Sequence, residues 1–173
     1  MSTVHRRLFF GLDATPLSQE LIALQQAWRL PARAIPAANF HLTLLFLGQC
    51  DERQYRALAA GADEILAAPL AMSLDESGWF PRAQVAWVGQ QTAPAPLLAL
   101  ARSLHTLAQS QELCPEPLHL RPHISLYRKA KAPPPALACP PLQLEASQFH
   151  LYESVSTPEG VRYFSRKRFM LRG

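Results

Sequence analysis

Two short apolar segments, one in each half of the chain, restrict the fold more than any other feature. Residues 40–48 (FHLTLLFLG) and 121–128 (RPHISLYR) both contain a histidine, an apolar residue, a hydroxyl residue and another apolar residue, in that order. Both segments are rich in strand-forming residues and are bounded by residues that interrupt regular structure. We therefore predict a buried strand at each, over about residues 40–47 and 119–128.

The alternation of side chains along a strand gives these two segments a shared geometry. Successive side chains point to opposite faces, so His41 and Thr43 lie on one face about 7 Å apart, and His123 and Ser125 do the same. The aliphatic residues between them turn to the other face and enter a core. Our hypothesis is that the two histidine–hydroxyl pairs face each other across one cleft.

The rest of the chain predicts an α+β fold. We expect further strands at about residues 7–12, 70–74, 84–88, 142–154 and 161–171. Helical spacing of leucines predicts a helix capped by Thr15 and Pro16, a second one capped by Asp51 and a third over about residues 97–107. The prolines of residues 131–141 predict an extended loop, and residues 157–160 a turn. A histidine strand in each half suggests one bilobal domain over residues 1–173, with two pseudo-symmetric antiparallel-sheet lobes flanked by helices.

Composition places few limits on function. The 173 residues are 49% hydrophobic and 17% charged, which is typical of a globular domain with a real core. The net charge of +4 is compatible with an anionic ligand but also with many other proteins. Three cysteines without CxxC spacing indicate free thiols in a reducing compartment. No segment predicts a signal peptide or a membrane span, so we expect a cytoplasmic protein. We also expect a monomer without an obligate protein partner.

The paired side chains suit the chemistry of a phosphodiester. In-line displacement at phosphorus needs one group to take a proton from water and another to give a proton to the leaving oxygen. His41 and His123 can perform either task near neutral pH. The hydroxyls of Thr43 and Ser125 can donate hydrogen bonds to the non-bridging oxygens. The structural alternative is a pair of core histidines bonded to neighbouring hydroxyls.

The two segments resemble the paired HxTx and HxSx motifs of the two-histidine (2H) phosphoesterase superfamily. Their extended forms, together with residues 7–12 and 163–171, resemble the bacterial and archaeal RNA 2',3'-cyclic phosphodiesterases, also called 2'-5' RNA ligases. This resemblance implies a bilobal fold with a cleft that holds both histidines. It also implies metal-independent hydrolysis of a 2',3'-cyclic phosphate to a 2'-phosphate, with 2'-5' ligation as the reverse reaction.

The resemblance also implies a role for each residue. His41 is expected to be the proton donor to the 3' oxygen, and His123 the base that activates water. Thr43 and Ser125 are expected to bind the phosphate, although relatives more often have threonine at the second position. Arg128 is expected to neutralise phosphate charge; the alternative for it is a solvated strand end.

Other residues raise weaker possibilities. Tyr127, at a position that is usually aliphatic, could stack on a base, but we favour packing. His119 lies four positions before His123, yet the intervening Pro122 opposes a helical metal pair, so we predict no metal. No Gly-rich phosphate loop is present, so we predict no nucleotide cofactor. The candidates for base stacking, most of which we expect to pack in the core, are Phe9, Phe46, Trp79, Trp87 and Phe149. The last predicted strand also carries a basic cluster that could bind an RNA backbone or protect a sheet edge: Arg162, Arg166, Lys167 and Arg168.

Two alternative functions remain open. The first is a non-catalytic module for single-stranded RNA, although the alternating exposed aromatics typical of such modules are not evident. The second is a related phosphodiesterase that acts on another small cyclic or 2'-5' linked nucleotide, because the motifs recognise a phosphate and not a base. The expected ligands are therefore RNA ends with a 2',3'-cyclic phosphate or small cyclic nucleotides.

Overall fold

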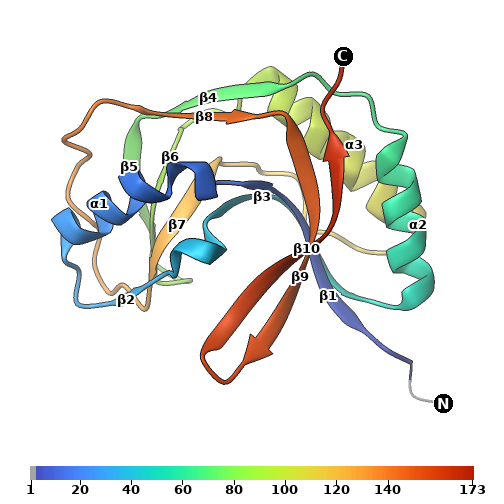
Figure 1. Cartoon of the computed structure of the whole chain (residues 1–173), viewed down its shortest axis with the longest axis horizontal. Coiled ribbons are helices and arrows are strands. Elements are labelled where there is room, and N and C mark those ends of the chain that lie inside the picture. The colour runs from blue at the N-terminus through green and yellow to red at the C-terminus, as the bar shows by residue number, and fades with distance from the viewer. Residues whose placement is uncertain (1–2) are drawn as a thin grey trace.

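The computed structural model describes residues 3–173 and shows the predicted α+β architecture (Figure 1). The strands are β1 (Arg6–Asp13), β2 (Arg33–Ala34), β3 (His41–Cys50), β4 (Leu70–Leu74), β5 (Glu76–Phe80), β6 (Val85–Gly89), β7 (His123–Arg128), β8 (Leu142–Ala146), β9 (Gln148–Thr157) and β10 (Gly160–Met170). The α-helices are α1 (Ser18–Trp28), α2 (Glu52–Asp63) and α3 (Ala95–Ser110), and short 3-10 helices span Thr15–Leu17 and Ala37–Asn39.

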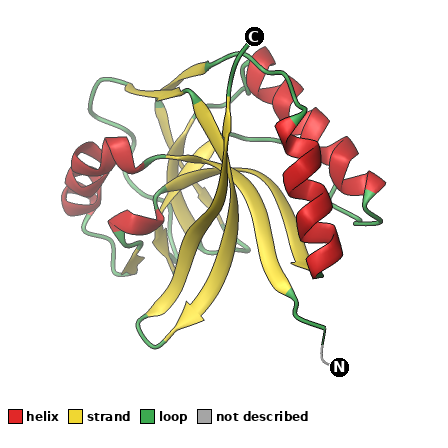
Figure 2. Ribbon diagram, turned by 45° about the vertical axis from the view of Figure 1, so that its right-hand side comes forward, coloured by secondary structure: helices red, strands yellow, loops and turns green. Residues whose placement is uncertain are grey.

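One antiparallel sheet runs through both halves of the chain. Its strand order is β10-β9-β1-β3-β7-β6-β5, with the short β2 paired to β7, and β4 and β8 form a separate two-stranded sheet. The two halves meet where β3 pairs with β7 through Leu42 and Ile124. Helices α2 and α3 lie next to each other on one side of the sheet, and α1 lies on the other (Figures 1 and 2).

The core receives the aliphatic residues of the two histidine strands, as the alternation predicts. Leu42, Ile124 and Leu126 are fully buried, and Leu44 is almost so. Helix α3 adds Leu97, Leu100 and Leu104 from one face, in agreement with the predicted leucine stripe. Burial of these side chains removes a large apolar area from water, which anchors both histidine strands to a rigid support.

Some local predictions are confirmed and others are wrong. Asp51 caps α2 as predicted: its carboxylate accepts a hydrogen bond from the backbone amide of Gln54, and the side-chain oxygen of Gln54 accepts one from the backbone amide of Asp51. Thr15 does not cap α1, because the Thr15 amide instead donates to Asp13 and a 3-10 turn precedes the helix. Gly48 does not end β3 but lies within it at φ +74°, a value that glycine adopts readily.

The sequence also missed several strand boundaries. The strands β2 and β5 were not predicted, and the segment predicted at 142–154 is divided into β8 and β9. The second histidine strand begins at His123, not near residue 119, because Pro122 cannot donate to a ladder. The loop at 131–141 and the turn at 157–160 are as predicted.

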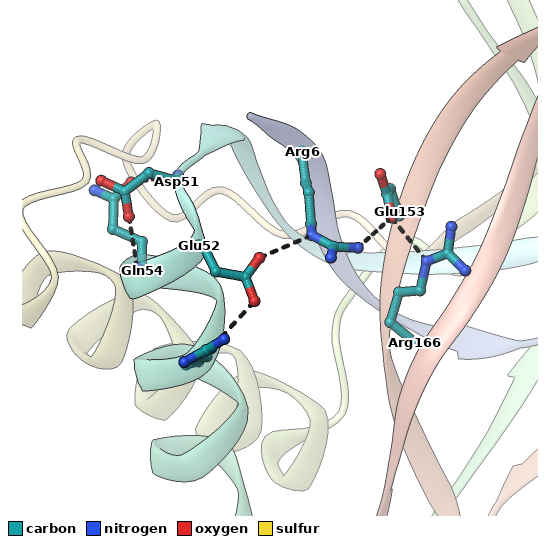
Figure 3. Close-up of polar contacts among 7 residues, drawn as sticks. Arg6, Asp51, Glu52, Gln54, Glu153 and Arg166 are labelled. Carbon is teal, nitrogen blue, oxygen red and sulfur yellow. Dashed lines mark hydrogen bonds and ion pairs between the residues drawn. The ribbon is translucent and has the colours of Figure 1, made fainter. Parts of the chain in front are cut away.

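An ion-pair network ties α2 to the sheet at the end remote from His41 (Figure 3). The guanidinium of Arg6 lies 3.4 Å from Glu52 of α2 and 3.1 Å from Glu153 of β9. Arg166 of β10 approaches the same Glu153 carboxylate at 2.7 Å. Because Glu153 is the least exposed member, these contacts join three strands and a helix more firmly than isolated surface pairs do.

Candidate active site

The pairing of β3 with β7 brings the four motif residues together. With Leu42 opposite Ile124 in an antiparallel ladder, His41 lies opposite Ser125, and Thr43 lies opposite His123. All four side chains are half-buried and point away from the core that receives Leu42 and Ile124. The structure thus places two imidazoles and two hydroxyls on one face where the two halves of the sheet join.

The imidazole of His41 is held by hydrogen bonds at both nitrogens. Its Nδ1 atom lies 2.7 Å from the carbonyl oxygen of Asn39, and its Nε2 atom lies 2.9 Å from Oγ1 of Thr43. A carbonyl only accepts, so Nδ1 carries the proton, and in the neutral ring Nε2 accepts from the threonine hydroxyl. The Nε2 lone pair of His41 is therefore directed to the face that carries the other motif residues.

The imidazole of His123 is oriented by the same kind of bond. Its Nδ1 atom lies 2.8 Å from the carbonyl oxygen of Arg121, again two residues earlier in the chain. The proton is fixed on Nδ1 here also, which leaves Nε2 as the atom able to accept or donate a proton towards a ligand. The two histidines are thus matched in tautomer and in orientation relative to their strands.

Aromatic rings form the walls beside each histidine. The ring centroids of Phe9 and Tyr163 lie 4.9 Å and 4.8 Å from that of His41. Phe80 and Trp87 lie 4.9 Å and 5.9 Å from His123. These rings exclude water from one side of each imidazole and restrict its rotation.

Burial lowers the pKa of both histidines. For His41 burial is the largest cause and brings the pKa to about 4; the bond to Asn39 opposes this shift, whereas the charges of His123 and Arg128 add to it. The pKa of His123 is lowered first by burial; the bond to the Arg121 carbonyl opposes this shift, and the charge of the Arg121 side chain adds to it. Both rings are therefore neutral at pH 7 in the empty site, and an anion bound between them would favour their protonation.

Arg128 lies at the edge of this group, where β7 ends. It is exposed, and its Nη2 atom donates a hydrogen bond to the Tyr163 hydroxyl at 3.0 Å. Its charge contributes to the lowered pKa of His41, and its bonding partner Tyr163 lies against that imidazole, with ring centroids 4.8 Å apart. Among the five candidate site residues, the structure brings His41, Thr43, His123 and Ser125 to one face and Arg128 to its border.

Sequence reasoning missed Asn39 and Tyr163. The buried Asn39 amide donates to the Val161 carbonyl at 2.8 Å, and its Oδ1 lies 3.4 Å from the Tyr163 amide. The same residue therefore orients His41 through its backbone and fastens the β9–β10 hairpin through its side chain. The position of Asn39 two residues before the motif histidine is visible in the sequence. Its partner strand β10 lies more than a hundred residues away, however, so the contact could not be predicted.

The remaining candidates are resolved by their surroundings. Tyr127 is buried and its hydroxyl donates to the Gln25 carbonyl, so it packs as favoured. Phe9, Trp87 and Phe149 are buried, Trp79 donates to the Ala130 carbonyl, and Phe46 is 67% exposed. Within residues 3–173, no group of three acidic, histidine or cysteine side chains is arranged to hold a metal ion, and no helix is long and apolar enough to span a membrane.

Two of the four basic residues in the cluster on β10 form ion pairs. Arg166 is paired with Glu153, and Lys167 with Asp63. Arg162 and Arg168 are exposed and form no ion pair among the described residues. Since β10 is the edge strand of the large sheet, this pattern fits edge protection for half of the cluster.

Comparisons with known proteins agree with this geometry. The model of the family "LigT like Phosphoesterase" matches residues 12–87. The RNA 2',3'-cyclic phosphodiesterase of Escherichia coli (strain K12) is 31% identical over 96% of this chain and 97% of its own length. A crystal structure of a phosphoesterase superposes with a TM-score of 0.87 at 29% identity, covering 98% of this chain and 100% of the other. The E. coli LigT complexed with 3'-AMP gives a TM-score of 0.86 at 29% identity with the same coverage.

The shared fold and the pair of His-x-hydroxyl strands define a phosphoesterase of the two-histidine class. A relative that is 31% identical over nearly the whole of both chains narrows this further. The chain belongs to the LigT-like phosphoesterase family, and it is an enzyme of the cyclic phosphodiesterase type.

Proposed function

We propose that the protein hydrolyses a 2',3'-cyclic phosphate at the end of an RNA chain to a 2'-phosphate, with residues 1–173 acting as one bilobal domain. The main support is the matched pair of imidazoles on one face of the sheet, each held by its Nδ1 to a carbonyl two residues earlier, which leaves Nε2 of each ring as the atom that can exchange a proton. The name of the E. coli relative and the 3'-AMP bound to E. coli LigT support a nucleotide substrate of this kind.

The two histidines exchange one proton each during the reaction. His123 Nε2 takes a proton from the attacking water, and protonated His41 gives its Nε2 proton to the leaving 3' oxygen, so that the P–O3' bond breaks as the new P–O bond forms. The assignment of acid and base follows the family resemblance, because the two rings are bonded alike. Proton exchange with water restores both rings. When the 5'-hydroxyl of a second RNA chain attacks in place of water, the same displacement forms a P–O5' bond, releases the 3' oxygen and gives a 2'-5' linkage, which is the ligation named in the family.

The low pKa of His41 fits an acid that is charged only when substrate is present. In the empty site burial holds that pKa at about 4. A bound phosphate brings a negative charge next to the ring, which favours the imidazolium and moves its pKa towards the working pH. The acid is thus formed together with the enzyme–substrate complex.

The hydroxyls and Arg128 bind the charge that develops on phosphorus. Thr43 donates to His41 Nε2 in the empty site. Once that nitrogen is protonated it can no longer accept, so the hydroxyl is released to donate to a non-bridging oxygen. Ser125 has the corresponding place on β7, and Arg128 supplies a full positive charge at the border of the site, where it bonds to Tyr163 beside His41. No step in this scheme uses a metal or a cofactor.

The decisive experiment measures hydrolysis of a nucleoside 2',3'-cyclic phosphate in EDTA and identifies the product isomer. We expect a 2'-phosphate, and we expect His41→Ala and His123→Ala each to lower kcat at least about a hundredfold. His105→Ala is the matched control, because His105 lies on α3 and bonds to the Glu116 carbonyl. Absence of turnover on both mononucleotides and cyclic-ended RNA would refute the proposal, and activity that survives both substitutions would make the histidines structural.

A further inference from the structure

A pocket lies next to His41 at the end of the site where β7 and β2 pair. Two arginines from adjacent strands, Arg33 and Arg128, line this pocket, which also includes Asn39, Tyr163 and residues 159–161 of the β9–β10 turn. Arg33 and Arg128 are directly opposite each other in the β2–β7 ladder. Residues directly opposite in an antiparallel ladder point to the same face, so both side chains lie on one side of this strand pair.

Both arginines are exposed and lack a neutralising partner. Among residues 3–173, neither guanidinium forms an ion pair, and Arg128 only donates to the neutral Tyr163 hydroxyl. The carboxylate of Glu159 lines the pocket at the exposed turn and carries no ion pair either. Two cations against one carboxylate leave an excess positive charge, which favours an anion.

The position of Arg33 is set by the glycine at the start of β10. A Cβ atom at Gly160 would lie 2.9 Å from Nη2 of Arg33, and Gly160 has φ +116°. The absence of a side chain therefore lets the guanidinium lie against the turn, where it lines the pocket together with Arg128. A residue at this turn with a larger side chain would push the Arg33 head group out of the pocket.

Two of the residues that line the pocket also contact the imidazole of His41. The backbone carbonyl of Asn39 accepts a hydrogen bond from Nδ1–H of His41, and the Tyr163 ring lies 4.8 Å from the imidazole. Both residues also line the pocket. The pocket is therefore on the His41 side of the phosphate, away from His123.

The chemistry of a cyclic end determines what can reach this pocket. The proton of His41 goes to the 3' oxygen, so the ribose that carries this oxygen lies on the His41 side. An RNA chain with a 2',3'-cyclic phosphate at its 3' end continues only from the 5' oxygen of that ribose, through a phosphate that bears a full negative charge. This phosphate is the further anion of such a substrate that lies nearest to the reacting phosphate, and so the one best placed to reach a pocket beside His41.

We propose that Arg33 and Arg128 form a subsite for the phosphate on the 5' oxygen of the terminal nucleotide, which favours oligonucleotide ends over cyclic mononucleosides. This inference rests on the proposed function and specifies its substrate class. Arg33 is the residue that it adds, since Arg128 also borders the reacting phosphate.

The test compares two small substrates that differ in a single phosphate. One is a nucleoside 2',3'-cyclic phosphate, and the other is the same compound with an added 5'-phosphate. We expect wild type to prefer the 5'-phosphorylated compound in kcat/KM, and Arg33→Ala to reduce this preference about threefold to tenfold. Arg33→Lys should retain part of the preference, because it keeps the charge but loses the planar fork.

The control variant is Arg102→Ala, which removes the same charge from an exposed position on α3 that does not line the pocket. It should leave the preference as in wild type. An equal loss on both substrates in Arg33→Ala, or equal kcat/KM values for the two substrates in a wild type that hydrolyses both, would overturn the subsite.

A binding measurement separates this inference from the proposed reaction. A fluorescent oligonucleotide that ends in a 2'-phosphate is titrated against wild type, Arg33→Ala and Arg102→Ala. Weaker binding and a smaller salt slope only in Arg33→Ala support the subsite even if wild type hydrolyses neither compound. Equal affinities in all three proteins would refute it, whatever the outcome of the hydrolysis assay.

Discussion

Leu42 of β3 is paired with Ile124 of β7, and both side chains are fully buried. This pair joins the two halves of the large sheet. It also sets the register of the site, since a slip by one residue would turn a histidine strand over and send its imidazole into the core. The same two strands therefore supply buried side chains to the core on one face and carry the histidines of the site on the other.

Truncation of this contact should affect stability and catalysis together. We expect Ile124→Ala to lower the free energy of unfolding by about 2–4 kcal/mol, because it leaves a cavity in a closed core. We also expect a lower kcat, because β7 can shift against β3 around that cavity. Leu58→Ala in α2 is the control, since Leu58 is equally buried but lies outside the histidine strands. Denaturant unfolding and kcat of the folded fraction are measured for both; unchanged kcat in Ile124→Ala would contradict this account.

Gly89 allows the close approach of β6 to His123. A Cβ at Gly89 would lie 2.1 Å from the Pro122 carbonyl oxygen and 3.0 Å from the Cα atom of His123. Gly89→Ala should therefore push β7 away, with a loss of about 2–3 kcal/mol in stability and a fall in kcat.

Gly48→Ala offers a contrast to that substitution. No atom lies within 4 Å of a Cβ built at Gly48, but φ is +74°. This variant should lose about 1–2 kcal/mol from backbone strain and retain wild-type kcat. Thermal unfolding and steady-state kinetics of the two alanine variants distinguish a displaced site from general destabilisation, and a similar kcat loss in both would argue against the role given to Gly89.

The lowered pKa of His41 predicts a pH dependence of stability. Between about 6.5 and about 4 the ring is protonated in the unfolded chain but neutral in the folded one. The unfolded state then binds more protons, so the stability contribution of this group is full above pH 6.5 and falls as the pH is lowered through that window. Relative to His41→Gln, wild type should lose about 1–2 kcal/mol of stability between pH 7 and pH 4.5, measured by urea unfolding. If the free energies of unfolding of the two proteins change in parallel with pH, the lowered pKa of His41 is disproved.

Anion binding should be coupled to proton uptake by the two histidines. Sulfate is a useful probe, because it stays fully ionised over this pH range and any proton taken up must come to the protein. Its negative charge should raise both histidine pKa values, so its affinity should increase as the pH falls from 7 to 5. Titration calorimetry in buffers of different ionisation enthalpy measures the protons taken up. Uptake should decrease in His41→Gln and in His123→Gln, and pH-independent binding would contradict the proposed acid.

The sequence predicted those parts of the site that depend on local alternation. The period of two along each histidine strand was enough to place His41 with Thr43 and His123 with Ser125 on one face, and Asp51 was recognisable as a cap from its own position. The register between β3 and β7 could not be predicted in this way, because it depends on how two segments from opposite halves of the chain pack. The hypothesis that the two pairs face each other across a cleft could not specify this register, and the structure places the pairs side by side on one face of a continuous sheet.

The parts that sequence reasoning missed depend on contacts between distant segments. Asn39 bonds to Val161, and Arg33 lies against Gly160, across more than a hundred residues. The two-residue strand β2 has no periodicity to detect, and β5 consists of half-buried residues without strict alternation. Tertiary packing alone selects these elements, so no local propensity indicated them.

The strand order has a consequence for synthesis of the chain. Strand β1 lies between β3 and β9, and Tyr163 beside His41 belongs to β10. On the ribosome, β1 must therefore expose one unpaired edge until β9 has emerged, and the wall of the site beside His41 forms only once β10 has followed. The nascent chain thus carries both motif histidines before it gains the ring that helps to bury His41, so the imidazole acquires its lowered pKa only after the β9–β10 hairpin has paired with β1.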